Sequence, residues 1–252
     1  MKNQRCIVKG VLLAMLLSHG AVAASKIDPT NSPMWEYLRQ QYIPDQEYKF
    51  DERITINTPM FAENATQVPI TIDARSIDHI EKILVLADIS PFQKVLEFEP
   101  GELAPILTFN MKVQQATAVR ALVRTKDKIW HVGSAMIDAS GGGCSAPSIG
   151  LADPAWQDNL GQISARWFSQ SQRLKLHIVH PQDTGLANGI PAFFLNQLHI
   201  TQKNGDTMAS FKLYEPISEN PMLSLQSQLP PKQIQLNFRD NNGNEFNKMV
   251  MP

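Results

Sequence analysis

The sequence predicts an all-β protein: two immunoglobulin-like antiparallel β-sandwich domains joined by a Gly-rich linker, with one short N-terminal helix. Three observations support this prediction. Short apolar runs alternate with polar residues over most of the chain, as in strands with one buried face. Asn-Gly pairs, which favour tight hairpin turns, occur at 204–205 and 242–243. Residues 140–159 are rich in glycine and interrupt the alternation between the two halves.

The first 24 residues have the features of a secretory signal peptide. Three basic residues precede an apolar run over 11–17, and the small residues at 21–23 form an A-x-A cleavage pattern. The run is shorter than the roughly 20 residues that span a bilayer. We therefore expect export by the general secretory route, cleavage after Ala23 or Ala24, and a periplasmic location. Cys6 precedes the apolar run, which argues against a lipoprotein anchor.

The expected mature chain is slightly acidic. The signal contains three of the 23 basic residues and none of the 24 acidic ones, which leaves 20 against 24 and a net charge of −4 with histidines neutral. Nucleic-acid-binding proteins present a basic face instead, and an anionic membrane surface would also favour basic residues. Neither is expected as a partner. About 228 residues suit one large β domain or two small ones.

The predicted helix and strands follow from the spacing of apolar residues and from the proline and turn residues that bound each run. A helix is expected over 34–42, after Pro33 and before Pro44. Period-two runs predict strands near 68–72, 80–86, 106–113, 119–124 and 129–137, and again near 174–178, 198–200, 209–213 and 234–238. We therefore divide the chain into a signal peptide (1–24), a first sandwich (25–139), a Gly-rich arm and linker (140–159) and a second sandwich (160–252).

Cys144 is the one cysteine that remains after signal cleavage, so no intramolecular disulfide can form. It follows Gly141, Gly142 and Gly143 and precedes Ser145. Because this segment offers little to pack, we expect a flexible arm that holds the thiol away from the body, with an ordinary pKa near 8.5. A reactive carrier or redox thiol and an incidental linker cysteine are both compatible with this pattern.

A catalytic thiol would need a base, and His131 and His180 are the candidates. Each is better explained as a strand or surface histidine. His177 and His180 are three apart on a predicted strand and should point to opposite faces, so no metal site is expected. Residues 240–244 resemble the start of a calcium loop but lack its distal Glu, and a hairpin explains them. No glycine-rich phosphate motif lies between a strand and a helix.

Several short motifs occur in the order found in one known family. The first half, roughly 45–145, contains Val68-Pro69-Ile70-Thr71-Ile72, Ala118-Val119-Arg120-Ala121 and Gly142-Gly143-Cys144. The second half, roughly 155–252, contains His180-Pro181-Gln182-Asp183-Thr184-Gly185-Leu186, Ile190-Pro191-Ala192, Ser218-Glu219-Asn220-Pro221 and Asp240-Asn241-Asn242-Gly243. The chain resembles the thiosulfate-oxidation carrier SoxYZ as a single fused chain, of the kind described as quinoprotein dehydrogenase-associated SoxYZ-like carriers. The first half resembles SoxY and the second SoxZ.

This resemblance implies a fold and a role. Two immunoglobulin-like sandwiches should pack together, and Cys144 should carry sulfur intermediates covalently, as a thiosulfonate or persulfide. Partners would be periplasmic sulfur-oxidation enzymes or a PQQ-dependent dehydrogenase system. In the separate SoxY subunit the arm ends the chain as Gly-Gly-Cys-Gly-Gly. Here Ser145, Ala146 and Pro147 follow the cysteine and the chain continues, so the arm should reach less far.

Three functions are carried forward. The leading hypothesis is a non-enzymatic covalent carrier, with Cys144 as its attachment site and no resident cofactor. The first alternative is a non-covalent accessory protein of a periplasmic PQQ-dependent dehydrogenase, which would retain its function with Cys144→Ser. The second is a thiol transferase, which requires a histidine ring within about 3.5 Å of the sulfur.

Overall fold

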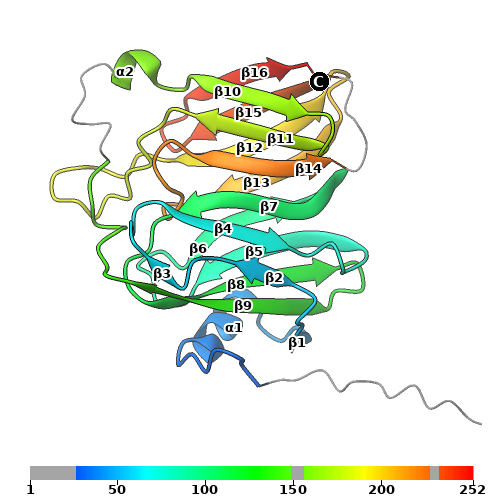
Figure 1. The fold of residues 1–252 in the computed structure, drawn as a ribbon, viewed down its shortest axis with the longest axis vertical. Coiled ribbons are helices and arrows are strands. Elements are labelled where there is room, and N and C mark those ends of the chain that lie inside the picture. Colours follow the sequence, from blue (N-terminus) through cyan, green and yellow to red (C-terminus); the bar gives the residue numbers. More distant parts are fainter. Residues whose placement is uncertain (1–26, 149–155, 228–232, 252) are drawn as a thin grey trace, which may run out of the picture.

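The computed structural model describes residues 27–148, 156–227 and 233–251, and they fold mainly into β-strands (Figure 1). The expected signal peptide lies outside the described residues. The elements are α1 (Trp35–Tyr42), β1 (Tyr48–Phe50), β2 (Thr55–Asn57), β3 (Phe61–Ala62), β4 (Val68–Asp73), β5 (Ile80–Ala87), β6 (Lys94–Glu99), β7 (Leu103–Met111), β8 (Thr117–Thr125), β9 (Trp130–Ala139), α2 (Trp156–Asn159), β10 (Ile163–Phe168), β11 (Arg173–Ile178), β12 (Leu195–Gln202), β13 (Thr207–Leu213), β14 (Met222–Ser227), β15 (Ile234–Asp240) and β16 (Glu245–Val250). The predicted all-β class and the short N-terminal helix are confirmed.

The strands form two sheets. The larger has the order β1-β9-β8-β5-β6-β13-β12-β15-β16, with β3 paired to β9, and the smaller has the order β10-β11-β14-β7-β4-β2. Most neighbours are antiparallel, while β1 and β3 run parallel to β9. Figure 1 shows the strands stacked in one column, from β9 above α1 to β16 at the opposite end.

Both sheets run through both halves of the chain. In the larger sheet β6 pairs with β13, and in the smaller sheet β7 pairs with β14. Phe98 and Phe211 face each other across this seam with ring centroids 4.4 Å apart and planes 9° apart. One apolar core contains residues of both halves. The halves are therefore joined by shared sheets as well as by the linker, and the boundaries at 139 and 160 stay a prediction.

Helix α1 covers the outer face of the larger sheet in the first half. Trp35 and Leu38 of the helix, with Ile43 just beyond it, pack against Leu84 of β5 and Leu122 of β8. The opposite faces of these two strands contribute to the sandwich core. Because β5 and β8 are covered on both faces, apolar residues occupy consecutive positions in each: Ile83–Ala87 in β5 and Ala121–Val123 in β8.

A buried arginine attaches the N-terminal segment to this sheet. Arg120 of β8 is fully buried and donates hydrogen bonds to the carboxylates of Asp88 and Asp28, at 2.7–2.8 Å. Its guanidinium lies 4.6 Å from the ring centroid of Trp35. The arginine lowers the pKa of Asp28 to about 2, against the opposing effect of burial. Two carboxylates and an aromatic face thus compensate the buried charge.

Both predicted hairpins are confirmed. Gly205, between β12 and β13, and Gly243, between β15 and β16, have φ of +92° and +91°, in the left-handed region that glycine accommodates. At the second turn Asp240 Oδ1 accepts hydrogen bonds from the backbone N–H groups of Asn242 and Asn244, both at 2.9 Å. The carboxylate of Asp240 is therefore engaged in holding the turn.

Candidate functional site

Cys144 is buried in the structure. It belongs to residues 140–148, here called the cysteine arm, which lie against the turn that follows β7. The residue is 0% exposed, and its thiol donates a hydrogen bond to the carbonyl of Lys112, with Sγ and O 3.7 Å apart. The expectation that the arm holds the thiol away from the body is therefore wrong for this structure. The residues that cover it are distant in sequence, so local composition does not reveal them.

The glycines of the arm permit close packing. Gly142 has φ of +85° and donates to the carbonyl of Gln114 at 2.9 Å, and Gly143 donates to the carbonyl of Val113 at 3.1 Å. A Cβ on Gly143 would lie 2.1 Å from the carbonyl oxygen of Ala65. Because that atom is backbone and cannot move aside cheaply, only glycine fits at 143 in this arrangement.

The side chain of Gln114 holds the turn around the cysteine. Its Oε1 accepts hydrogen bonds from the backbone N–H groups of Cys144 at 3.1 Å and Ser145 at 3.2 Å. Gly141, at φ of +100°, begins the turn. The four residues predicted as a flexible arm, Gly141, Gly142, Gly143 and Ser145, thus lie together against 112–114.

The second half of the chain contacts the cysteine arm from the other side. We call the residues that hold the arm, Lys112, Gln114, Asp183 and Thr184, the seat. Thr184 donates from Oγ1 to the carbonyl of Cys144 at 2.6 Å. Ser148 donates from its backbone N–H and its hydroxyl to the two carboxylate oxygens of Asp183, both at 3.0 Å. Both partners lie in the motif 180–185. That motif was noted in the sequence, and its contact with the cysteine arm was not foreseen.

Lys112 is the charged residue of the site that the sequence did not suggest. It is 2% exposed, and its ammonium donates a hydrogen bond to the carbonyl of Gln182. Burial lowers the pKa of Lys112, and the neighbouring Asp183 and Cys144 oppose this shift. Burial raises the pKa of Cys144 to about 11, against the opposing effects of Lys112 and Ser90. The docked thiol is therefore protonated near neutral pH, which corrects the expectation of ordinary acidity.

The two histidine candidates have other partners. His131 Nδ1 lies 2.6 Å from Asp51 Oδ2. His180 Nε2 lies 3.7 Å from Asp240 Oδ2, and burial lowers the pKa of His180 to about 4, so its ring is neutral. Within the described ranges neither ring hydrogen-bonds to the thiol of Cys144. The described residues therefore do not show the histidine contact that a thiol transferase would require.

His177 lies on β11 and His180 just beyond its end. Over the described parts of the chain, no group of three or more His, Cys, Asp or Glu side chains is placed to hold a metal ion. Among the same residues, no helix is long and apolar enough to cross a membrane.

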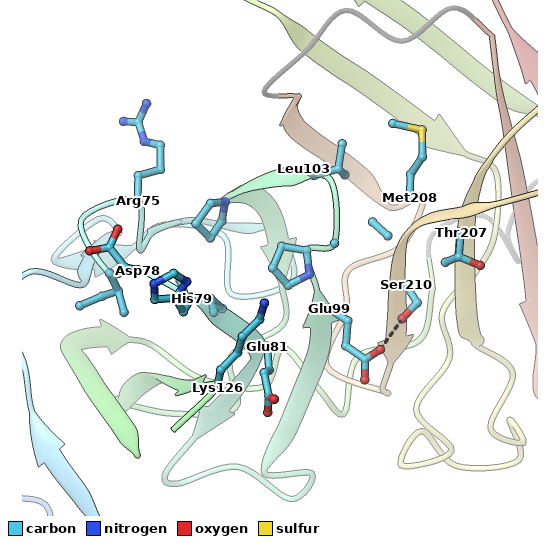
Figure 2. A pocket seen from close by; sticks show the side chains of 16 residues that line it. Arg75, Asp78, His79, Glu81, Glu99, Leu103, Lys126, Thr207, Met208 and Ser210 are labelled. Carbon is cyan, nitrogen blue, oxygen red and sulfur yellow. Dashed lines mark hydrogen bonds between the residues drawn. The ribbon is translucent and has the colours of Figure 1, made fainter. Parts of the chain in front are cut away.

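A cavity of about 590 Å³, whose lining residues Figure 2 shows, lies at the other end of β7. Leu103, which begins β7, lines it, so roughly 30 Å of strand separates it from Lys112. Its charged groups mostly have partners: Glu99 accepts from Ser210 at 3.1 Å, and Arg75 pairs with a neighbouring aspartate. We therefore place the functional site at the cysteine arm.

The chain matches the models of two protein families. The family model of sulfur oxidation protein SoxY matches residues 39–144, and that of sulphur oxidation protein SoxZ matches residues 164–251. A search of curated proteins finds no match. Among solved structures, the chain is similar to the sulfur carrier protein SoxY from Chlorobium limicola f thiosulfatophilum, with 16% identity, a TM-score of 0.38, and coverage of 42% of this chain and 96% of that one. A superoxide reductase (neelaredoxin) variant from Ignicoccus hospitalis matches with 18% identity, a TM-score of 0.29, and coverage of 34% and 79%.

The fold and the family matches define a class: an all-β carrier protein of sulfur oxidation, built from two sandwich halves. The chain belongs to the SoxY and SoxZ families, with one domain of each fused in a single polypeptide. Members of these families are carriers rather than enzymes, and they work with partner sulfur-oxidation proteins. The SoxY match ends at Cys144 itself.

Proposed function

We propose that this protein is a periplasmic carrier that holds sulfur intermediates covalently on Cys144 and presents them to sulfur-oxidation enzymes. The observation that carries the proposal is the seat of the cysteine arm. Both halves contribute specific hydrogen bonds to a short glycine-rich segment whose one reactive group is this thiol. An incidental linker cysteine would need no such seat.

The proposed carrier alternates between two states of the arm. In the docked state the thiol is buried and protonated, so it cannot attack a donor. In the undocked state it would regain ordinary acidity and reach a partner's site. Three hydrogen bonds oppose release, at about 1 kcal/mol each: one that Thr184 donates to the arm and two that Asp183 accepts from it. The arm is tethered at both ends, so a partner must approach the body closely.

Two loading reactions are chemically balanced. In sulfane exchange the Cys144 thiolate attacks the terminal sulfur of a donor persulfide; a new S–S bond forms, the donor's S–S bond breaks, and the donor thiolate leaves with no net oxidation. Joining thiosulfate instead forms an S-linked thiosulfonate and releases two electrons. That reaction needs an electron acceptor, which a partner redox enzyme would supply.

The test is the intact mass of the protein purified from its native periplasm, before and after a mild reductant. We expect a reducible adduct on Cys144 with the added mass of sulfur or thiosulfate, and no adduct on Cys144→Ser. A clean mass that stays unchanged after incubation with sulfur compounds and cell extract would contradict covalent carriage. If Cys144→Ser also kept its function, a non-covalent accessory role beside a PQQ-dependent dehydrogenase would explain the protein better.

A further inference from the structure

Lys112 is an unusual residue for the interior of a small β protein. Its ammonium has three N–H donors, and within the described residues it makes one hydrogen bond, to the carbonyl of Gln182, and no salt bridge. The residue is 2% exposed, so water does not replace the missing partners freely. A buried ammonium without a direct ion pair is costly, and departures of this kind are expected at functional or strained sites.

The carboxylates near Lys112 act on its ammonium at a distance and form no ion pair with it in the described residues. Asp183 acts electrostatically on the ammonium, but both of its carboxylate oxygens accept hydrogen bonds from Ser148 of the arm. Glu219 is a weaker electrostatic neighbour. Cys144 lies against the same residue, because its thiol donates to the carbonyl of Lys112. The thiol is neutral in this position and gives the ammonium no compensating charge.

We infer that Lys112 recognises an anionic sulfur group on Cys144, so that the arm docks more firmly when it is loaded than when it carries a neutral group. This inference rests on the proposed function and names its cargo class. A persulfide extends the side chain by about 2 Å, one S–S bond, and it is more acidic than a thiol. Its terminal sulfur would accept charge-assisted hydrogen bonds from the ammonium, which are stronger than neutral ones. Lys112 is thus a positioning residue.

The test compares adducts of different charge on the full chain. Exchange with polysulfide, Cys–S⁻ + HS–S⁻ → Cys–S–S⁻ + HS⁻, gives the anionic persulfide. Methyl methanethiosulfonate gives a neutral S-methyl disulfide and releases methanesulfinate. Intact mass establishes each adduct. The readout is amide hydrogen exchange over residues 140–148, where the N–H groups of Gly142, Gly143 and Cys144 are bonded in the docked arm.

In the unmodified sequence we expect the persulfide arm to exchange about tenfold more slowly than the S-methyl arm, as one charge-assisted hydrogen bond implies. Lys112→Met should reduce this ratio to about one, and Lys112→Arg should restore it. Lys94→Met is the matched control. Lys94 is a half-buried lysine that pairs with Glu97 near the seam, and its loss should leave the ratio unchanged.

Equal exchange of the persulfide and S-methyl arms, or a ratio that survives Lys112→Met, would overturn the inference. If Lys112→Met does not fold, a third adduct keeps the test decisive. A cationic aminoethyl disulfide on the unmodified sequence should exchange faster than the S-methyl arm, and equal exchange refutes the role of charge. All adducts in this test are made chemically. If protein from the native periplasm carried no adduct in its intact mass, the proposed function would be refuted, but this test would still apply.

Discussion

Replacing Thr184 by valine should loosen the cysteine arm without unfolding the protein. The threonine hydroxyl donates to the carbonyl of Cys144 at 2.6 Å and accepts from the backbone N–H of Leu186 at 3.2 Å. Valine has the same shape but no hydroxyl. In Thr184→Val the carbonyl of Cys144 stays in a buried site without this donor as long as the arm is docked, and regains water when the arm is released.

The size of the effect follows from the lost hydrogen bond. A buried carbonyl that loses its donor costs about 1–2 kcal/mol, and each 1.4 kcal/mol is a tenfold change in an equilibrium constant. The undocked population should therefore rise about 5- to 30-fold. The assay is the rate at which iodoacetamide labels Cys144 under native conditions, because the buried thiol reacts only after the arm opens. The rate then scales with the undocked fraction.

Two comparisons make this result specific. Thr184→Ser retains the hydroxyl and should label at close to the original rate. The urea midpoint of Thr184→Val should change far less than its labelling rate, since the core strands are untouched. A labelling rate equal to that of the unmodified sequence would show that the hydrogen bond does not hold the arm, and the two-state picture would fail.

Three further perturbations test other parts of the structure. Gly143→Ala places a Cβ 2.1 Å from the carbonyl oxygen of Ala65, so the arm cannot dock and Cys144 should label as fast as an exposed thiol; slow labelling would contradict the packing. Because docking raises the pKa of Cys144 to about 11, docking is fully stable below the ordinary pKa of the free thiol; above it, docking should lose about 1.4 kcal/mol per pH unit up to about pH 11, seen as faster opening in hydrogen exchange. Arg120→Met leaves Asp88 buried and unpaired and should cost about 3–5 kcal/mol in urea unfolding; an unchanged midpoint would contradict this.

The strands that the sequence predicted are those whose apolar residues alternate clearly with polar ones or that lie beside a clear hairpin turn. β4, β11 and β13 alternate, and the hairpins at 204–205 and 242–243 are fixed by their own residues. β6 and β14 were not predicted. β6 is buried at four consecutive positions because it lies at the seam against β13, and its short apolar run has no period of two. Each of these strands has one neighbour from the other half of the chain, and the local sequence carries no signal of that pairing.

The candidate site was predicted only in part. The uniqueness of Cys144 and the glycines before it are properties of the sequence, and the structure places them together. Burial of the thiol is different, because it depends on Lys112, 32 residues earlier, and on Thr184, 40 residues later. Composition of the segment 140–149 suggested that nothing nearby could change the pKa of the thiol. The fold instead places Lys112, which follows β7, against the thiol and buries both.

The seat of the arm depends on the sheets that the two halves of the chain share. Lys112 and Gln114 follow β7, while Asp183 and Thr184 belong to the loop between β11 and β12. These two segments are held in register because β7 pairs with β14 and β14 with β11 in one sheet. Either half alone would offer only one side of the seat: the first half holds the contacts of Lys112 and Gln114, and the second those of Asp183 and Thr184. The docked arm therefore uses residues of both matched regions, and the sheet that the two halves share is what brings those residues to one site.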